Sequence, residues 1–130
     1  MKFGERTNVL VRALVGDDPA QTKKAERVFL QYAKDDGVFV SLVVLAEIAW
    51  MLSAAYRWER SVIHDRLVRL VRTRGVIVEE VDLVESALER FREGKADLAD
   101  YLTTGKAASV GAELVTFDKR LAREGGVRLL

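Results

Sequence analysis

Four acidic residues give the clearest chemical signal in this sequence: Glu47, Asp97, Asp100 and Asp118. Asp97 and Asp100 are three residues apart in a helical pattern, so their side chains share one face. Carboxylates that converge repel one another, and burying them is costly unless a cation neutralises them. Mg²⁺ and Mn²⁺ prefer oxygen ligands of this kind, and such an ion can activate water and stabilise a phosphodiester during cleavage. The four acids are therefore candidate metal ligands for phosphodiester chemistry.

Each of these acids also has a purely structural explanation. Glu47 lies within the apolar run "LVVLAEIAWMLSAAY", where it is expected to be buried and can pair with a basic group. Asp97 and Asp100 can serve as helix cap and first-turn residue, positions that favour negative charge. Asp118 follows the run "LVTF" and can cap a last helix. Spacing alone does not decide between these explanations and a metal site.

The elements that must position these acids alternate between strands and helices. Strands are predicted at residues 3–10, 37–41, 76–81, 112–118 and 127–130. Helices are predicted at 18–34, 42–56, 59–75, 82–94 and 96–111, with a short helix or turn at 119–126. Pro19 is placed in the first turn of its helix, and Asp82 and Gly94 are expected to begin and end theirs. This order indicates an α/β fold with a parallel sheet covered on both faces, whose ligands gather at the carboxyl ends of the strands.

Composition indicates one soluble globular domain spanning residues 1–130. Hydrophobic residues make up 49% and charged residues 32% of the chain. The net charge of +1 excludes a polycation, so any nucleic-acid contact requires a local patch. The candidate patch, which is otherwise a solvated helix face, comprises Arg66, Arg69, Arg72 and Arg74. The absence of cysteine excludes disulfides and thiol catalysis, and without a membrane-spanning run or a signal-peptide core the chain is predicted to be cytoplasmic.

Four further residues receive an interpretation from the sequence. His64, the only histidine, is expected at the surface, because no partner stands at ligand or triad spacing. Trp50, Tyr56 and Trp58 are candidates for a dimer or antitoxin interface, and for Trp50 a place in the core is favoured. An unrelated small-molecule binder is an alternative for the whole chain, but no G-x-G-x-x-G or Walker-type loop supports it.

Three segments together resemble the PIN-domain family, and within it the VapC-type ribonuclease toxins of bacterial toxin–antitoxin pairs. They are "TNVLVRALVGDDPAQ", "SLVVLAEIAWML" and "ADLADYLTTGKAASVGAELVTFDKRLA", and the resemblance covers nearly the whole chain. It implies a three-layer α/β/α sandwich with a parallel sheet of four or five strands. It also implies an Mg²⁺-dependent (or Mn²⁺-dependent) endoribonuclease, usually a homodimer, that a small VapB-like antitoxin silences.

Position by position, the resemblance assigns the metal-binding carboxylates to Glu47, Asp100 and Asp118, with Asp97 as an additional acid. The supporting polar residues that it implies are Thr7, Asn8 and Thr116. The RNA target and the antitoxin are not specified by these motifs.

One position departs from the family pattern: Arg6 stands where the first-strand aspartate, a central metal contact, is expected. A guanidinium cannot lose its proton at a usable pH and cannot coordinate a cation. It would instead pair with the remaining carboxylates and repel Mg²⁺. Glu5 is a poor substitute, because neighbouring residues on a strand face opposite sides. Arg6 therefore predicts low or absent activity, with a non-catalytic module that binds antitoxin or RNA as the alternative function.

Overall fold

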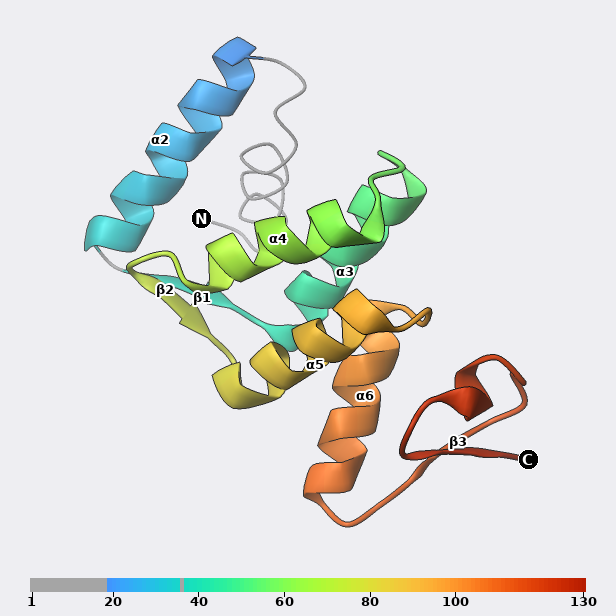
Figure 1. Cartoon of the computed structure of the whole chain (residues 1–130). Helices are drawn as coiled ribbons and strands as arrows, with labels where there is room; N and C mark the ends of the chain where they lie inside the picture. The colour runs from blue at the N-terminus through green and yellow to red at the C-terminus, as the bar shows by residue number, and fades with distance from the viewer. Residues whose placement is uncertain (1–18, 36) are drawn as a thin grey trace.

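The computed structural model describes residues 19–35 and 37–130 (Figure 1). The described helices are α2 (Pro19–Asp35), α3 (Leu42–Ala54), α4 (Arg60–Val71), α5 (Val81–Glu93), α6 (Leu98–Ser109) and the short 3-10 helix η1 (Leu121–Arg123). The described strands are β1 (Val38–Val40), β2 (Val76–Val78), β3 (Leu114–Thr116) and β4 (Val127–Leu129). From α2 onward this order is the one predicted. The predicted strand at residues 3–10, with Glu5, Arg6, Thr7 and Asn8, lies outside the described residues.

All described strand pairs are parallel, as the alternation of strands and helices predicts. β1 pairs with β2, placing Val38 beside Val76, and β3 pairs with β4, placing Leu114 beside Val127. The four strands form two separate pairs. Among the described residues, the predicted parallel sheet of four or five strands is present as these two pairs.

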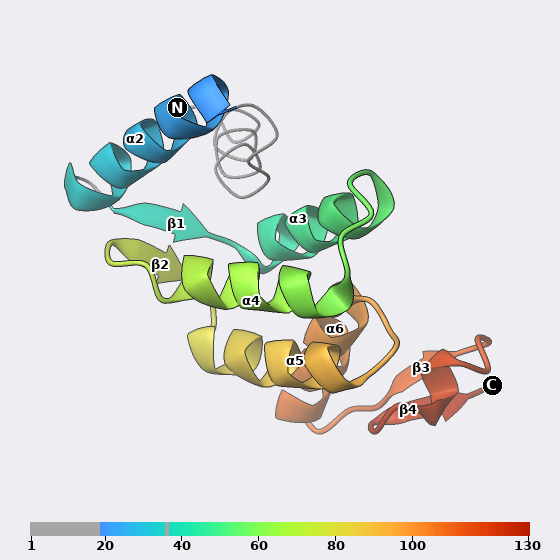
Figure 2. The same ribbon diagram turned by 45° about the horizontal axis from the view of Figure 1, so that its top comes forward.

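Most of the buried core lies among the helices. Leu45, Ile48 and Leu52 of α3 pack with Leu67 of α4 and Tyr101 of α6, and each side chain is at most 1% exposed. Figure 2 shows α4 lying along α3 and α5, with α6 crossing behind α5. The β3–β4 pair stands beyond α6, and no described residue after Thr104 is buried. The C-terminal pair must therefore be held mainly by contacts other than core packing.

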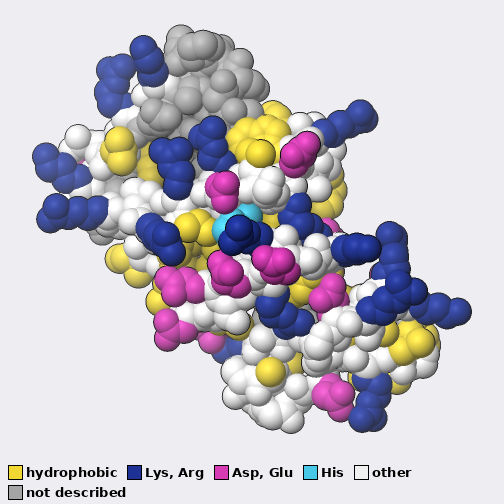
Figure 3. All heavy atoms as spheres, viewed as in Figure 1, with side chains coloured by type: hydrophobic (Ala, Val, Ile, Leu, Met, Phe, Trp, Pro, Cys, Tyr) yellow, Lys and Arg dark blue, Asp and Glu magenta, His cyan; other side chains and the backbone are white. Residues whose placement is uncertain are grey.

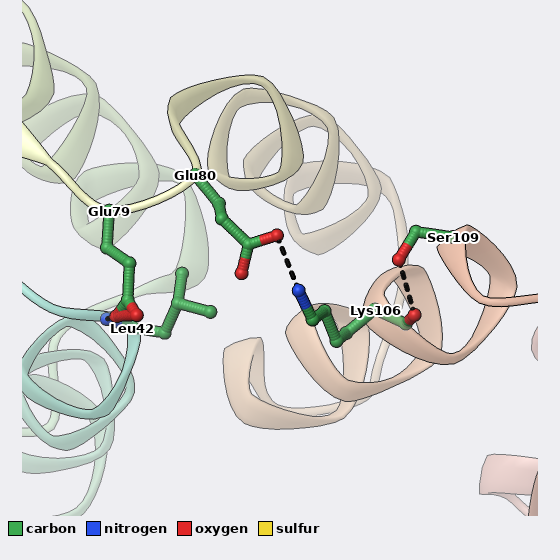
Figure 4. Close-up of polar contacts among 5 residues, drawn as sticks. All are labelled: Leu42, Glu79, Glu80, Lys106 and Ser109. Atoms are coloured by element: carbon green, nitrogen blue, oxygen red, sulfur yellow. Dashed lines mark hydrogen bonds and ion pairs between the residues drawn. The ribbon is translucent and has the colours of Figure 1, made fainter.

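The residues after β2 contact both helices that carry candidate acids, at the start of α3 and in the last turn of α6. Glu79 accepts a hydrogen bond from the Leu42 backbone N–H (2.9 Å). This N–H lies in the first turn of α3, where backbone donors have no partner within the helix, so Glu79 satisfies it. Glu80 pairs instead with Lys106 of α6 through an Nζ–Oε1 distance of 2.7 Å, and Figure 4 shows these two neighbours reaching toward different helices. The carboxyl end of β2 thereby ties α3 and α6 to the same sheet edge.

Helix ends follow the predicted signals at Pro19 and Gly94 but not at the start of α5 or at the end of α4, which ends at Val71 before the predicted Gly75. Pro19 begins α2 and Gly94 follows the last residue of α5, as predicted. The predicted cap at Asp82 is wrong, because α5 begins at Val81 and Glu80 occupies the N-cap with a left-handed φ of 46°. The Glu80–Lys106 ion pair gives that residue a tertiary partner, which local helix signals do not reveal.

Candidate active site

Two of the candidate acids lie at the start of α6. Asp97 occupies the N-cap with an extended backbone, and Asp100 lies in the first turn. The Asp97 backbone N–H donates a hydrogen bond to Oδ2 of Asp100 (3.2 Å), which confirms that the two acids share one face. Asp100 is half-buried, whereas Asp97 is exposed. The helix start thus holds one carboxylate in a fixed orientation with a second acid beside it.

The hydroxyl of Tyr101 fastens the C-terminal segment to this helix start. It donates a hydrogen bond to Oε1 of Glu124 (2.9 Å) and accepts one from the Ala96 N–H (3.2 Å). Burial raises the pKa of the Tyr101 phenol, so this group remains a donor at neutral pH. Arg90 adds a second link, because its guanidinium lies 5.0 Å from the centre of the Tyr101 ring and donates to the Gly125 carbonyl (2.9 Å).

Asp118 lies just beyond β3, where sequence analysis places it. Its backbone N–H donates to Oγ1 of Thr116 (3.0 Å), and its Oδ1 accepts a hydrogen bond from the Arg120 N–H (2.8 Å). These bonds orient the Asp118 carboxylate in the turn before η1, whose N-cap is Arg120 and not Asp118 as predicted. The side chain is also exposed, which leaves its second oxygen open to solvent. This structural role and a metal-binding role are therefore compatible.

Electrostatics connect these acids around Asp100. The pKa of Asp100 is raised, chiefly by burial and further by the negative charges of Asp97, Asp118 and Glu124, against a lowering by the Asp97 N–H. Glu124 belongs to this group although sequence analysis did not identify it. Its segment, "KRLAREGG", carries no local signal, and only the hydroxyl of Tyr101 shows where it lies. The start of α6 is thus a site of concentrated negative charge that favours a cation.

Glu47 occupies a different environment from the one predicted. It is exposed, because α3 buries the opposite side of the helix through Val44, Ile48 and Leu52. The expectation of a buried acid is therefore wrong. Glu47 is also not among the acids that raise the pKa of Asp100. The structure gathers Asp97, Asp100 and Asp118 but does not add Glu47 to them.

Carboxylates are the donors that a hard divalent cation requires, so the acids near α6 fit Mg²⁺ or Mn²⁺ in kind. Within residues 19–35 and 37–130, no three acidic or histidine side chains come close enough together to hold an ion. The three positions expected to complete the site, residues 6–8, lie outside this range. The described residues therefore do not form a complete coordination shell by themselves.

His64 is buried, contrary to the expectation of a surface residue. It is 7% exposed and lies where α4 packs on α5, with Nδ1 at 3.0 Å from Oδ1 of Asp65 and Nε2 at 3.7 Å from Oε1 of Glu89. Nε2 has no hydrogen-bond partner among the described residues. Both acids are largely exposed, so the buried imidazole ring lies beneath two carboxylates at the surface. This environment is structural and is separate from the acids of α6.

The basic residues of α4 are exposed, as a nucleic-acid patch requires. Arg66, Arg69 and Arg72 all face solvent, and so does Arg74 just beyond the helix. Figure 3 shows acidic side chains gathered along α5 with Lys and Arg side chains over α4. The basic patch is therefore bordered by the acidic side chains of α5.

No helix in the described part of the chain has the length and apolarity needed to cross a membrane.

We expect Asp100→Asn to raise the melting temperature at pH 8. The folded-state pKa of Asp100 lies above its ordinary value of 3.8, so the ionised carboxylate costs stability at neutral and higher pH. That cost disappears as the pH falls through the raised pKa toward 3.8. The advantage of the variant should therefore shrink in thermal melts between pH 8 and pH 4. Glu85→Gln, an exposed α5 control, should show little such change, and a pH-independent loss in Asp100→Asn would contradict the acid cluster.

Comparison with known proteins gives two matches that span most of the chain. The model of the PIN domain matches residues 7–126. The chain is also 26% identical over 121 residues to the VapC ribonuclease of Aquifex aeolicus, covering 92% of this chain and 89% of that protein. No solved structure matches. The family match begins at the residue directly after Arg6.

Proposed function

The chain belongs to the PIN-domain family, and we propose that it is a VapC-like endoribonuclease toxin that depends on Mg²⁺ or Mn²⁺. The observation that carries this proposal is the arrangement at the start of α6, where the Asp97 N–H holds the half-buried carboxylate of Asp100. Burial first, and then the charges of Asp97 and Asp118, raise the pKa of Asp100. Mutual repulsion of this kind is typical of groups arranged for a function. The similarity to a VapC ribonuclease supplies the substrate class, RNA.

In this proposal Asp100, Asp118 and Glu47 hold the cation, and Asp97 supports it from the helix cap. A bound ion would activate water and stabilise the negative charge on the phosphodiester. The backbone of the chain orients the carboxylates of Asp100 and Asp118. The Asp97 N–H fixes one oxygen of Asp100, and the Arg120 N–H fixes one oxygen of Asp118. Glu47 is exposed on α3 and is proposed as the ligand that this helix contributes.

Supporting roles follow from the same assignment. Thr116 holds the Asp118 backbone through its hydroxyl, which supports its predicted role beside the metal ligands. Thr7 and Asn8 are proposed to support the site from the segment before α2.

We further propose a homodimer in the cytoplasm, silenced by a VapB-like antitoxin that shields the acids. We propose that Arg6 acts on the acids in a similar way from within the chain. It would pair with the carboxylates and weaken metal binding.

A non-catalytic module that binds antitoxin or RNA is the second candidate. Arg6 favours it, because a guanidinium at the position of a metal ligand opposes metal chemistry. Under this alternative the fold and its partner surface are kept while cleavage is lost.

The two candidates are separated by RNA cleavage measured in the Arg6→Asp background with Mg²⁺ or Mn²⁺. Mutation of a residue that only supports a metal ligand lowers activity by up to about 100-fold. Removing a ligand itself should therefore lower the cleavage rate by at least that factor. We therefore expect Glu47→Gln, Asp100→Asn and Asp118→Asn each to lower the rate at least that much, and EDTA to abolish it. Glu85→Gln is the control for loss of an unrelated acid. Cleavage that persists in EDTA, or in all three variants, would contradict the proposal.

A further inference from the structure

Trp50 is unusual in its exposure. Its side chain is 61% exposed on α3, although sequence analysis expects it in the core. It borders a pocket between α3, α4 and the start of α6, which is also lined by Ser53, Trp58, Arg60 and Asp97. A large indole left open beside such a pocket offers a flat apolar surface that no described core residue covers.

The walls of the pocket are fixed by contacts on both sides. Arg60 donates two hydrogen bonds to the Ala96 carbonyl (2.9 and 2.7 Å), and its guanidinium lies 4.2 Å from the centre of the Phe91 ring. These contacts hold the segment that leads into α6. On the other side, the Arg66 guanidinium lies 5.7 Å from the centre of the Trp58 ring. The pocket is thus lined by two indoles, Arg60 and Asp97, and Arg66 lies outside it beside Trp58.

Asp97 connects this pocket to the candidate active site. Asp97 lines the pocket, and its backbone N–H donates a hydrogen bond to the carboxylate of Asp100. A ligand in the pocket would therefore lie beside one of the proposed acids, three residues before Asp100 in the sequence.

We infer that this pocket receives one unpaired base of the RNA substrate, stacked on Trp50, while the adjoining phosphodiester reaches Asp100. This inference rests on the proposed function. Proteins bind single-stranded RNA by stacking bases on aromatic side chains and by placing Arg groups along the phosphates. Arg66 and the exposed residues of α4 supply positive charge next to Trp58. The Asp97 carboxylate repels phosphate but can accept hydrogen bonds from the amino group of a base.

A protein segment is the other conceivable occupant, and the pocket fits it less well. Interface cores are depleted in acidic residues, whereas this pocket contains Asp97. The pocket also shares Asp97 with the helix start that holds Asp100, which suits a substrate of the proposed site. Docking of an antitoxin at Trp50 is therefore an outcome of the test and not part of the inference.

The test measures RNA binding in the Asp100→Asn background, which removes cleavage. The chain contains two tryptophans, so adding Trp58→Phe leaves Trp50 as the only indole. Titration with a short single-stranded oligoribonucleotide should quench the Trp50 emission. Stacking one base is worth about 1–3 kcal/mol, so Trp50→Ala should weaken the Kd by roughly 5- to 150-fold, measured by fluorescence anisotropy of labelled RNA.

Two variants serve as controls. Trp50→Phe keeps an aromatic ring and should retain most of the affinity. Val43→Ala changes a residue of α3 that is 69% exposed and does not line the pocket, and it should bind RNA like the parent. Melting temperatures of all variants check that the fold is kept.

Equal RNA affinity of the parent and Trp50→Ala would overturn the pocket assignment and leave the proposed function standing. Unchanged RNA affinity together with weakened binding of the antitoxin would also overturn it and identify a protein-docking surface. Failure of the parent to bind RNA would overturn both the pocket and the proposed function. Quenching and a selective loss of affinity in Trp50→Ala would support the inference.

Discussion

Arg6→Asp is expected to raise the affinity of the protein for Mn²⁺ by at least about 100-fold. At a separation of 4 Å and an effective dielectric constant near 20, two unit charges interact by roughly 4 kcal/mol, and a tenfold change in affinity corresponds to about 1.4 kcal/mol. Reversing the charge at position 6 removes a repulsion from the divalent ion and adds an attraction to it. The expected gain is therefore large even after screening by solvent.

Calorimetric titration with Mn²⁺ measures this change directly. Arg74→Asp is a matched control, because it alters the net charge equally at an exposed position just after α4. It should leave the affinity within a few-fold of the parent value. Without metal, Arg6→Asp should melt at a lower temperature than the parent, since one more carboxylate joins the acids around Asp100. Equal Mn²⁺ affinity in the parent and Arg6→Asp would show that Arg6 does not face the metal site.

Gly94→Ala is expected to destabilise the protein by about 2–3 kcal/mol, the upper range for an overpacked site. Gly94 follows α5 and faces Tyr101, and a Cβ there would overlap the hydroxyl oxygen of Tyr101 and lie 2.8 Å from its Cζ. The backbone φ of −96° is open to any residue, so the effect is steric. Displacing Tyr101 also disturbs its bonds to Ala96 and Glu124.

Chemical denaturation of a glycine pair measures this effect. Gly125→Ala is the control, because its nearest neighbour would be an Arg90 nitrogen at 3.8 Å, an ordinary contact. Adding Tyr101→Phe to Gly94→Ala removes the oxygen that overlaps and should recover part of the stability. A Gly94→Ala protein as stable as Gly125→Ala would contradict the close packing of Tyr101 at the start of α6.

The order and type of the described elements follow from local patterns. Pro19 and Gly94 mark helix ends by backbone constraints that act within a few residues, and the short apolar runs at 38–40 and 76–78 form parallel strands. The pairing of Asp97 with Asp100 is equally local, because helix geometry places residues three apart on one face. These features could be predicted because each depends on neighbours in the sequence.

The incorrect expectations concern which way a side chain faces in the folded chain. The run that forms α3 is apolar nearly all round, so its sequence does not show that Glu47 and Trp50 face outward while Ile48 and Leu52 face the core. The burial of His64 depends on the packing of α4 against α5. Glu124 joins the site through the hydroxyl of Tyr101, 23 residues away in the sequence. Each of these outcomes is set by tertiary contacts between elements.

The measurement that tests the central claim most directly is cleavage of a structured RNA pool with excess Mg²⁺ or Mn²⁺ by three proteins in parallel. They are the parent, Arg6→Asp, and Arg6→Asp combined with Asp100→Asn. We predict rapid, metal-dependent cleavage by Arg6→Asp, little or none by the parent, and loss of cleavage when Asp100 is also replaced. Equal metal-dependent cleavage by the parent and Arg6→Asp would contradict the role given to Arg6. Absence of cleavage in all three would contradict the assignment as a ribonuclease and favour the non-catalytic module.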